Sequence, residues 1–145
     1  MALPPQAPQS AELYLAVQHF YARQMQLLDD GKADEWAATF TEDAVFAANA
    51  RPEPVRGRAD IAAGARQATE QLALDGLVRR HWLGMLSVDT RSDGTVLARS
   101  YALVISTPKG GQAGIHVSTV CADVLVWDGD DLLVRSRHVT RDDLV

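Results

Sequence analysis

The sequence predicts a single α+β domain in which helices come first and a long antiparallel sheet follows. A chain of 145 residues suits one domain, which at this length hides roughly 70% of the surface that the unfolded chain exposes. Its residues are 47% hydrophobic, which is enough to build a core. The apolar pattern is mainly helical up to about residue 73 and has a period of two from residue 78. Short turn segments separate the alternating runs, which indicates hairpins rather than βαβ units.

The N-terminal region predicts an arm and then a helix. Residues 1–10 are expected to form a flexible arm, because Pro4, Pro5 and Pro8 disfavour regular structure. Ser10 is the predicted N-cap of a helix over residues 11–30, which ends at Gly31. The side chains that recur on one face of this helix are Leu13, Val17, Phe20, Gln24, Leu27 and Leu28.

Two shorter helices and a short strand are predicted next. Asp34 can cap a helix in which Trp36 and Phe40 lie four residues apart on one face. Residues 41–43 end this helix, residues 44–47 form a strand, and residues 51–54 form a loop because they hold two prolines. A third helix is predicted over residues 59–73, with an inner face made of Ile61, Ala65, Ala68 and Leu72.

Four long strands are predicted over residues 78–90, 95–107, 112–127 and 131–140. The segments between them are rich in Gly, Pro, Asp and Ser, which are residues of tight turns. A sheet whose one face is covered by helices is expected to curl around them into a cone with a mouth at one end. Such a cone is a natural pocket for a small molecule.

Composition and charge argue against several classes of function. The 14 Lys and Arg residues against 19 Asp and Glu give a net charge of −5, and the longest basic run is Arg79–Arg80, so no nucleic acid partner is expected. The single cysteine, Cys121, lies in an alternating apolar run and is expected to be a buried, inert thiol. The chain has neither an apolar membrane span nor the features of a signal peptide, which predicts a soluble, cytoplasmic protein without a membrane partner.

Four strings carry a resemblance to a known superfamily. They are Leu-Leu-Asp-Asp-Gly at residues 27–31, the stretch from Trp36 to Phe46, Arg80–His81, and residues 137–139 followed by Asp142. Over residues 11–143 the chain resembles the nuclear transport factor 2-like superfamily, and within it the SnoaL-like polyketide cyclases, scytalone dehydratase and the beta subunits of ring-hydroxylating dioxygenases. The resemblance implies one cone-shaped domain of cystatin-like fold, with a curved mixed or antiparallel sheet around the N-terminal helices, and a homodimer formed through the sheet face. It does not decide the reaction, because the fold hosts many functions.

His81 is the first candidate catalytic residue. Strand alternation places its side chain in phase with Leu83 and Met85, so the imidazole enters the pocket if that face is the concave one. An imidazole there can accept and return a proton near neutral pH. The alternative is a core histidine that is hydrogen-bonded to the backbone. In scytalone dehydratase, which the chain resembles, the corresponding histidine acts in elimination.

Asp29 and Asp30 are candidate catalytic partners of His81. Two acids at the C-terminus of a helix are unfavourable with the helix dipole, so at least one needs a reason beyond helix stability. A carboxylate beside His81 would orient the imidazole and raise its basicity. The alternative is a solvated Asp-Asp-Gly turn. The resemblance implies that one aspartate of this segment faces the pocket, and it leaves the choice between the two open.

Aromatic side chains supply further candidates. Tyr14 and Tyr21 lie seven residues apart on nearly the same helix face, and Tyr101 lies in the second long strand. A phenol can donate a hydrogen bond to a substrate carbonyl, which places Tyr21 with the catalytic residues and Tyr14 and Tyr101 with the substrate-binding ones. The alternative is a tyrosine at the edge of the core with a solvated hydroxyl. Phe46, from a matching string, is also expected to contact substrate.

Arg137 and His138 are candidate substrate contacts in the last strand. Neighbouring residues of a strand face opposite sides, so only one of the two can enter the pocket. Unbroken alternation groups His138 with Leu132, Val134 and Ser136, and it groups Arg137 with Leu133, Arg135 and Val139. The alternative for the face with Arg135 and Arg137 is a solvated surface or a dimer seam.

Other chemistries lack the residue patterns that they need. His116 and Asp123 are seven residues apart on opposite strand faces, so they form no nucleophile site with Ser118. The four histidines lack metal-ligand spacing, and the glycine segments lack a phosphate-binding pattern. We therefore expect no metal and no cofactor.

The sequence supports two hypotheses of function. The first is a cofactor-independent acid–base enzyme, a dehydratase, cyclase or isomerase, acting on a polyketide-like or aromatic small molecule of secondary metabolism. His81 would move the proton, Asp29 or Asp30 would orient it, and a tyrosine would polarise a carbonyl. The second is a non-catalytic binding or assembly module similar to a dioxygenase beta subunit. A hollow cone with His81 beside a carboxylate favours the first, and a filled cone with His81 bonded only to backbone favours the second.

Overall fold

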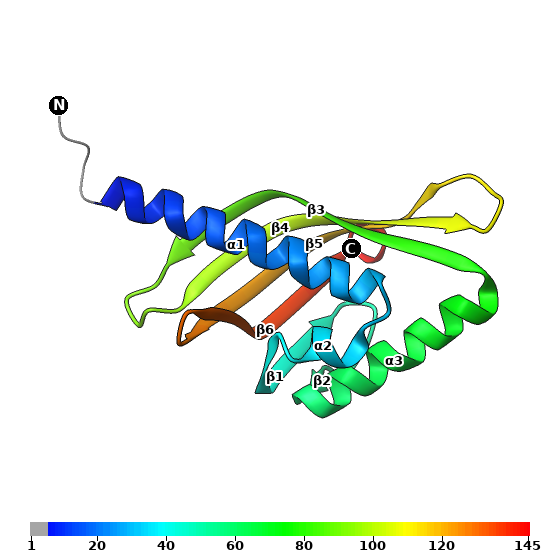
Figure 1. The fold of residues 1–145 in the computed structure, drawn as a ribbon, viewed down its shortest axis with the longest axis horizontal. Helices are drawn as coiled ribbons and strands as arrows, with labels where there is room; N and C mark the ends of the chain where they lie inside the picture. The colour runs from blue at the N-terminus through cyan, green and yellow to red at the C-terminus, as the bar shows by residue number, and fades with distance from the viewer. Residues whose placement is uncertain (1–5) are drawn as a thin grey trace.

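The computed structural model describes residues 6–145 and shows helices followed by long strands (Figure 1). Its elements are α1 (Gln6–Asp29), α2 (Ala33–Ala37), β1 (Phe40–Ala48), β2 (Val55–Arg56), α3 (Arg58–Asp75), β3 (Leu77–Thr90), β4 (Val96–Pro108), β5 (Gly114–Asp128), β6 (Asp131–Arg141) and the 3-10 helix η1 (Asp142–Leu144). The predicted α+β class is confirmed. None of the helices in the described part of the chain is long and apolar enough to cross a membrane.

The six strands form one mixed sheet in the order β2-β1-β6-β5-β4-β3. Strands β3 to β6 form an antiparallel meander, as the turn segments predict, and β1 joins it by pairing parallel to β6. Figure 1 shows α1 crossing one face of the curved sheet, while α2 and α3 lie together at one end. The helices therefore cover one face of the sheet, which we call the inner face.

The core lies between the inner face and the helices. Trp36 of α2 and Phe40 of β1 meet edge to face, with ring centroids 4.8 Å apart. The fully buried side chains around them include Val17 of α1, Leu125 of β5 and Val134 of β6. Helical spacing on α1 and alternation along the strands therefore supply one continuous apolar layer.

Several predicted boundaries are wrong by a few residues. Helix α1 begins at Gln6 rather than after Ser10, so residues 6–10 of the predicted arm are helical, and residues 1–5 lie outside the described residues. Pro8 is compatible with this start because the N–H groups of the first helical turn have no partner within the helix. Phe40 does not end α2 but begins β1, where it pairs with Val134 of β6. On α3 the buried residues are Ile61, Ala62 and Ala65, while Ala68 is exposed.

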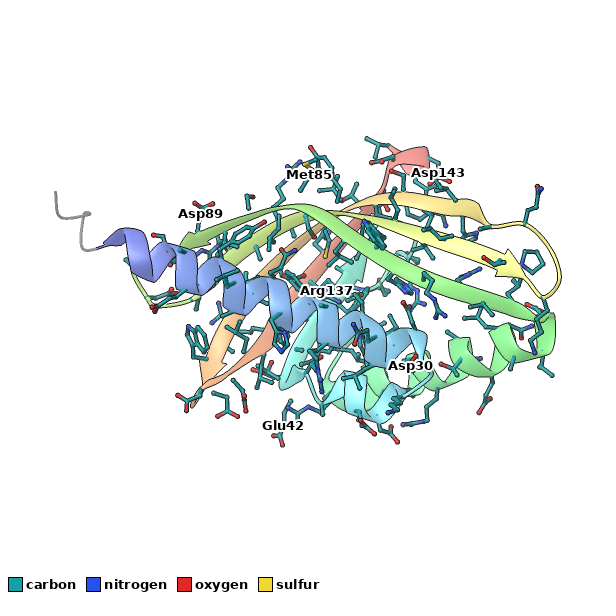
Figure 2. All side chains as sticks on the ribbon, turned by 45° about the horizontal axis from the view of Figure 1, so that its top comes forward. Asp30, Glu42, Met85, Asp89, Arg137 and Asp143 are labelled. Atoms are coloured by element: carbon teal, nitrogen blue, oxygen red, sulfur yellow. The ribbon has the colours of Figure 1, made fainter. Side chains whose placement is uncertain are left out.

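A bulge in β3 overturns the predicted alternation of that strand. The register of β3 on β4 shifts between Gly84 and Ser87, and Met85 has a positive φ of 52°. Leu83 stays packed against the core, but Met85 is 80% exposed and lies on the side of β3 away from α1 (Figure 2). An extra residue inverts which side chains face inward, so Met85 does not share the face of His81.

A second bulge corrects the predicted faces of β6. Leu125 of β5 pairs with Val134, whereas Val124 pairs with Ser136, so Arg135 is the extra residue. Val134 and Arg137 are therefore both buried, and His138 is exposed. As expected, only one of Arg137 and His138 enters the interior, and the bulge decides that it is Arg137.

Candidate functional site

His81 and Asp29 form a close pair where the end of α1 meets β3. The Nδ1 of His81 lies 2.7 Å from Oδ1 of Asp29, and the backbone N–H of His81 donates to Oδ2 and Oδ1 of the same carboxylate at 3.1 Å and 3.3 Å. The side chains are 27% and 9% exposed, respectively. A carboxylate can only accept here, so Nδ1 carries the proton that it donates to Asp29. The second ring nitrogen, Nε2, is then the one that can accept a proton.

The C-terminal end of α1 positions Asp29, rather than Asp30, beside His81. Gly31 has a φ of 75° and donates to the carbonyl of Leu28 at 3.1 Å, which ends the helix in the left-handed conformation that glycine favours. A Cβ at Gly31 would lie 3.0 Å from Cγ2 of Thr69 on α3, so the turn is also packed closely. Asp30 is exposed, and Figure 2 labels it at the end of α1. The choice that the sequence left open is therefore decided for Asp29.

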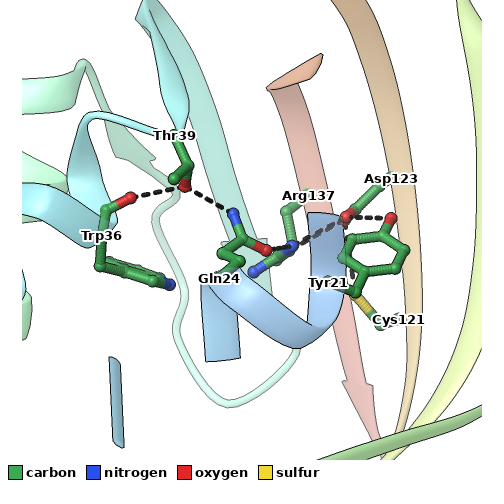
Figure 3. A network of polar contacts seen from close by, with 7 residues as sticks. All are labelled: Tyr21, Gln24, Trp36, Thr39, Cys121, Asp123 and Arg137. Carbon is green, nitrogen blue, oxygen red and sulfur yellow. Dashed lines mark hydrogen bonds and ion pairs between the residues drawn. The ribbon is translucent and has the colours of Figure 1, made fainter. Parts of the chain in front are cut away.

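A second polar group is buried between α1 and the sheet (Figure 3). Arg137 donates from Nε to Oδ1 of Asp123 at 2.9 Å and from Nη2 to Oδ2 at 2.9 Å. Its Nη2 also donates to Gln24 at 2.7 Å, and the hydroxyl of Tyr21 donates to Asp123 at 2.6 Å. The Arg137 side chain is 4% exposed and the Asp123 side chain 0%. We call these four residues the Arg137 network.

The Arg137 network continues into the loop before β1. Gln24 donates through Nε2 to Oγ1 of Thr39 at 2.7 Å, and that hydroxyl donates to the carbonyl of Trp36 at 2.5 Å. The network thus joins α1, α2, β5 and β6 by hydrogen bonds. Arg137 also lies over the ring of Phe40, with 5.3 Å between its guanidinium carbon and the ring centroid.

Burial determines the protonation states in this network. Desolvation raises the pKa of Tyr21, and the Asp123 carboxylate raises it further, so the phenol keeps its proton. Burial alone would lower the pKa of Arg137, but the Asp123 carboxylate outweighs it, and the net shift is upward. Burial also raises the pKa of Cys121 to about 12, which is the buried thiol that the sequence predicts.

The Arg137 network does not match the roles expected from sequence. The Tyr21 hydroxyl is engaged by Asp123, so the structure does not offer it to a substrate carbonyl, and the buried Arg137 donates to Asp123 and Gln24. Sequence reasoning missed Asp123 as the centre of the network. Its signal was a carboxylate in the apolar β5 run, but only the register that pairs Asp123 with Arg137 shows its partner.

The remaining predicted residues are not brought to His81. Tyr14 is 40% exposed and lies fifteen residues before Asp29, about 22 Å along the helix axis. Tyr101 is 47% exposed on the outer face of the sheet, beneath the guanidinium of Arg99. His138 is exposed, and Phe46 packs on the rings of Trp36 and Phe40 in the core.

An open depression of about 560 Å³ lies where α2, β1 and the start of α3 meet. Its lining residues are Asp34, Ala37, Glu42, Arg58, Ala59, Ala62 and Arg66. Neither His81 nor Asp29 lines it, so the expected pocket does not coincide with this depression. Within the part of the chain that the structure describes, no three His, Cys, Asp or Glu side chains are grouped as a metal site.

Comparisons with known proteins agree on one group of relatives. A model of the SnoaL-like domain matches residues 9–138. The structure of Aln2 from a Streptomyces species is 38% identical with a TM-score of 0.86, covering 99% of this chain and 96% of that one. ActVI-ORFA from Streptomyces coelicolor is 36% identical with a TM-score of 0.82, covering 90% and 98%. A Catenulispora acidiphila structure in complex with S-DNPA is 40% identical with a TM-score of 0.79, covering 92% and 96%.

More distant structures share the fold alone. An NTF2-like protein with a cystatin-like fold from Novosphingobium aromaticivorans is 24% identical with a TM-score of 0.77, and a dioxygenase beta subunit from the same organism is 20% identical with a TM-score of 0.72. Among curated proteins, none matches the chain. Because the family model covers most of the chain and the three nearer structures share more than a third of its residues over nearly their whole length, the protein belongs to the SnoaL-like family, which has the nuclear transport factor 2-like fold.

Proposed function

We propose that the protein is a cofactor-independent acid–base enzyme, a dehydratase, cyclase or isomerase that acts on an aromatic, polyketide-like small molecule. The observation that carries the proposal is the hydrogen bond between the Asp29 carboxylate and Nδ1 of His81. The SnoaL-like family model and the similarity to Aln2 and ActVI-ORFA support a polyketide-related, cyclase-type reaction. The S-DNPA complex of the Catenulispora relative supports a small-molecule ligand.

The geometry suits proton transfer at Nε2 of His81. Asp29 accepts hydrogen bonds from both the ring and the backbone N–H of His81, which limits rotation of the imidazole and selects its tautomer. The carboxylate also stabilises the imidazolium that forms when Nε2 takes a proton. A partly exposed ring held in this way can act without a metal or an organic cofactor, since a substrate carbonyl supplies the acidity of the neighbouring C–H bond.

Elimination of water illustrates the chemistry that this pair supports. Nε2 of His81 accepts the proton from the carbon next to the carbonyl, and the C–H electron pair forms the enolate. The enolate then expels the hydroxyl group on the β carbon. The imidazolium returns its proton to that oxygen, which leaves as water, so the protein ends in its starting state. Cyclisation and isomerisation begin with the same first step.

The experiment follows dehydration of the aldol adduct of naphthaldehyde and acetone, whose conjugated enone product absorbs at longer wavelength. His81→Ala should lower the rate by about 10²–10⁴-fold, which is the usual contribution of a positioned acid–base group. Asp29→Asn should lower kcat and change the pH profile, whereas Asp30→Asn is the matched control and should keep the wild-type rate. Solvent deuterium incorporation into the ketone, followed by NMR, detects the same proton transfer when no water is lost. If His81→Ala retains both activities, the proposal fails.

The second candidate function is a non-catalytic assembly module. Two observations favour it: the open depression lies away from His81, and the interior beside α1 is filled by the Arg137 network. In that case His81→Ala would leave every activity of the protein unchanged, and removal of the chain would lower the activity of a larger partner enzyme. The Asp29–His81 pair is the reason that we place catalysis first.

We also propose that a second copy of the chain covers the outer face of the sheet. Large apolar side chains are exposed there on β3, β4 and β5: Val78, Trp82, Tyr101 and Ile115. The exposed Arg80 and Asp89 lie toward opposite ends of β3, so a two-fold arrangement can bring Arg80 of one copy near Asp89 of the other. An apolar face with charges of opposite sign at its two ends is complementary to itself.

A further inference from the structure

Arg79 lies beside the Asp29–His81 pair on the same strand face. The pairing of β3 with β4 is regular here, with Arg79 opposite Ser106 and His81 opposite Val104. Residues two apart in a regular strand point to the same side and are separated by about 7 Å. Arg79 is accordingly half-buried on the inner face, whereas Arg80 is exposed.

The guanidinium of Arg79 is not satisfied by the protein. Its Nε is buried and has no hydrogen-bond partner. Three other arginines in the described part of the chain are paired with carboxylates, Arg66 with Asp34, Arg137 with Asp123 and Arg141 with Asp143, but Arg79 forms no such pair there. A buried donor without a partner is unfavourable in the folded protein, so its presence indicates that the guanidinium lacks a hydrogen-bond acceptor.

The charge of Arg79 also acts on His116 of β5. Burial lowers the pKa of His116 on β5, and the charges of Arg79 and Arg141 lower it further, while Asp143 acts in the opposite direction. Arg141 donates to both oxygens of Asp143, at 3.0 Å and 2.7 Å, so its charge is largely compensated. Asp29 is engaged by His81, so Arg79 forms no ion pair within the described residues.

We propose that Arg79 binds a carboxylate group of the small-molecule ligand, next to the proton-transfer site at His81. The planar guanidinium presents paired N–H donors that match the two oxygens of a carboxylate. The terminal Nη groups, unlike Nε, are not fully buried, so they are the donors that a ligand can reach. The proposal rests on the proposed function for the role of His81, and it adds that the ligand is an acid.

The test compares two probes of nearly equal shape, naphthylacetate and naphthylacetamide, which differ in charge. Calorimetry should show that the wild-type protein binds the acid at least about tenfold more tightly than the amide, as expected for a hydrogen bond to a charged group. Arg79→Gln should abolish this preference and leave the affinity for the amide unchanged. Arg79→Lys keeps the charge but not the paired donors, and should retain part of the preference. Arg91→Gln removes the same charge from the exposed turn between β3 and β4 and is the matched control that should keep all of it.

The results separate this proposal from the proposed function. The carboxylate site is refuted if Arg79→Gln keeps the preference for the acid, or if the wild-type protein does not prefer the acid. This holds whether or not His81→Ala retains proton transfer. If Arg79→Gln loses the preference while His81→Ala retains proton transfer, the carboxylate site stands and the enzyme proposal fails. Because Arg79 has no protein partner, Arg79→Gln should keep the wild-type Tm, which excludes unfolding as the cause of lost binding.

Discussion

Replacing Asp123 by Asn should strongly destabilise the protein, because it leaves Arg137 charged in the interior without a counter-charge. Asp123 is fully buried and accepts two hydrogen bonds from Arg137 and one from Tyr21. Removing one partner of a buried ion pair costs about 3–5 kcal/mol. With an unfolding entropy of about 2.1 cal/mol/K per residue, that loss lowers the Tm by roughly 10–16 °C for a domain of this length.

The assay is thermal and urea unfolding, followed by circular dichroism at one fixed protein concentration, since self-association would make the Tm depend on concentration. The chain contains its own control in Arg141 and Asp143, whose side chains are 34% and 57% exposed. Asp143→Asn should cost at most about 1 kcal/mol, because solvent already screens that pair. The two substitutions make the same chemical change, so burial is the variable that differs.

A second substitution tests the proposed cause. Arg137→Met in the Asp123→Asn background removes the unpaired buried charge and should restore part of the lost stability, since apolar groups often replace a buried ion pair at little cost. The reasoning is refuted if Asp123→Asn costs no more than Asp143→Asn. It is also refuted if the double variant is less stable than Asp123→Asn alone.

Three further predictions test other parts of the structure. The free energy of unfolding should fall by about 1.4 kcal/mol per pH unit as the pH rises from about 9 toward 12. The cause is that the Cys121 thiol ionises near pH 9 in the unfolded chain and only at about 12 when it is buried. Urea unfolding should show a shallower fall for the Cys121→Ala variant. Met85→Gly should raise the free energy of unfolding by about 1 kcal/mol, because Met85 has a positive φ and an exposed side chain, whereas Ser87→Gly in the same strand should lower it. Trp82→Glu should convert the proposed homodimer into monomers in sedimentation experiments. A wild-type protein that itself sediments with the mass of one chain would contradict the dimer.

The elements that local patterns define were predictable. The helical spacing on α1, the turn residues between the long strands and the order of elements all depend on neighbours within a few positions. The errors in element bounds occur at Gln6 and at Phe40, which pairs with the distant Val134, and the errors in side-chain direction occur at the bulges of β3 and β6. The parallel pairing of β1 with β6 joins segments about ninety residues apart, and no local pattern specifies it.

The candidate site was predictable in part. His81 and an aspartate at the end of the first helix followed from residue chemistry, and the structure places Asp29 on the imidazole. Tyr21 and Arg137 were chosen for contact with substrate, but the structure pairs both with Asp123. A carboxylate buried in β5 shows its partners only when β5 and β6 are aligned.

The sequence by itself determined the α+β class, the sheet-forming half of the chain and the residue types available for acid–base chemistry. These follow from hydrophobic period and turn chemistry, which are local properties. The tertiary structure decided which neighbour of each pair turns inward: Asp29 instead of Asp30, and Arg137 instead of His138. The reason is that a helix end and the β6 bulge at Arg135 set side-chain direction, and the bulge exists only in the pairing of β5 with β6.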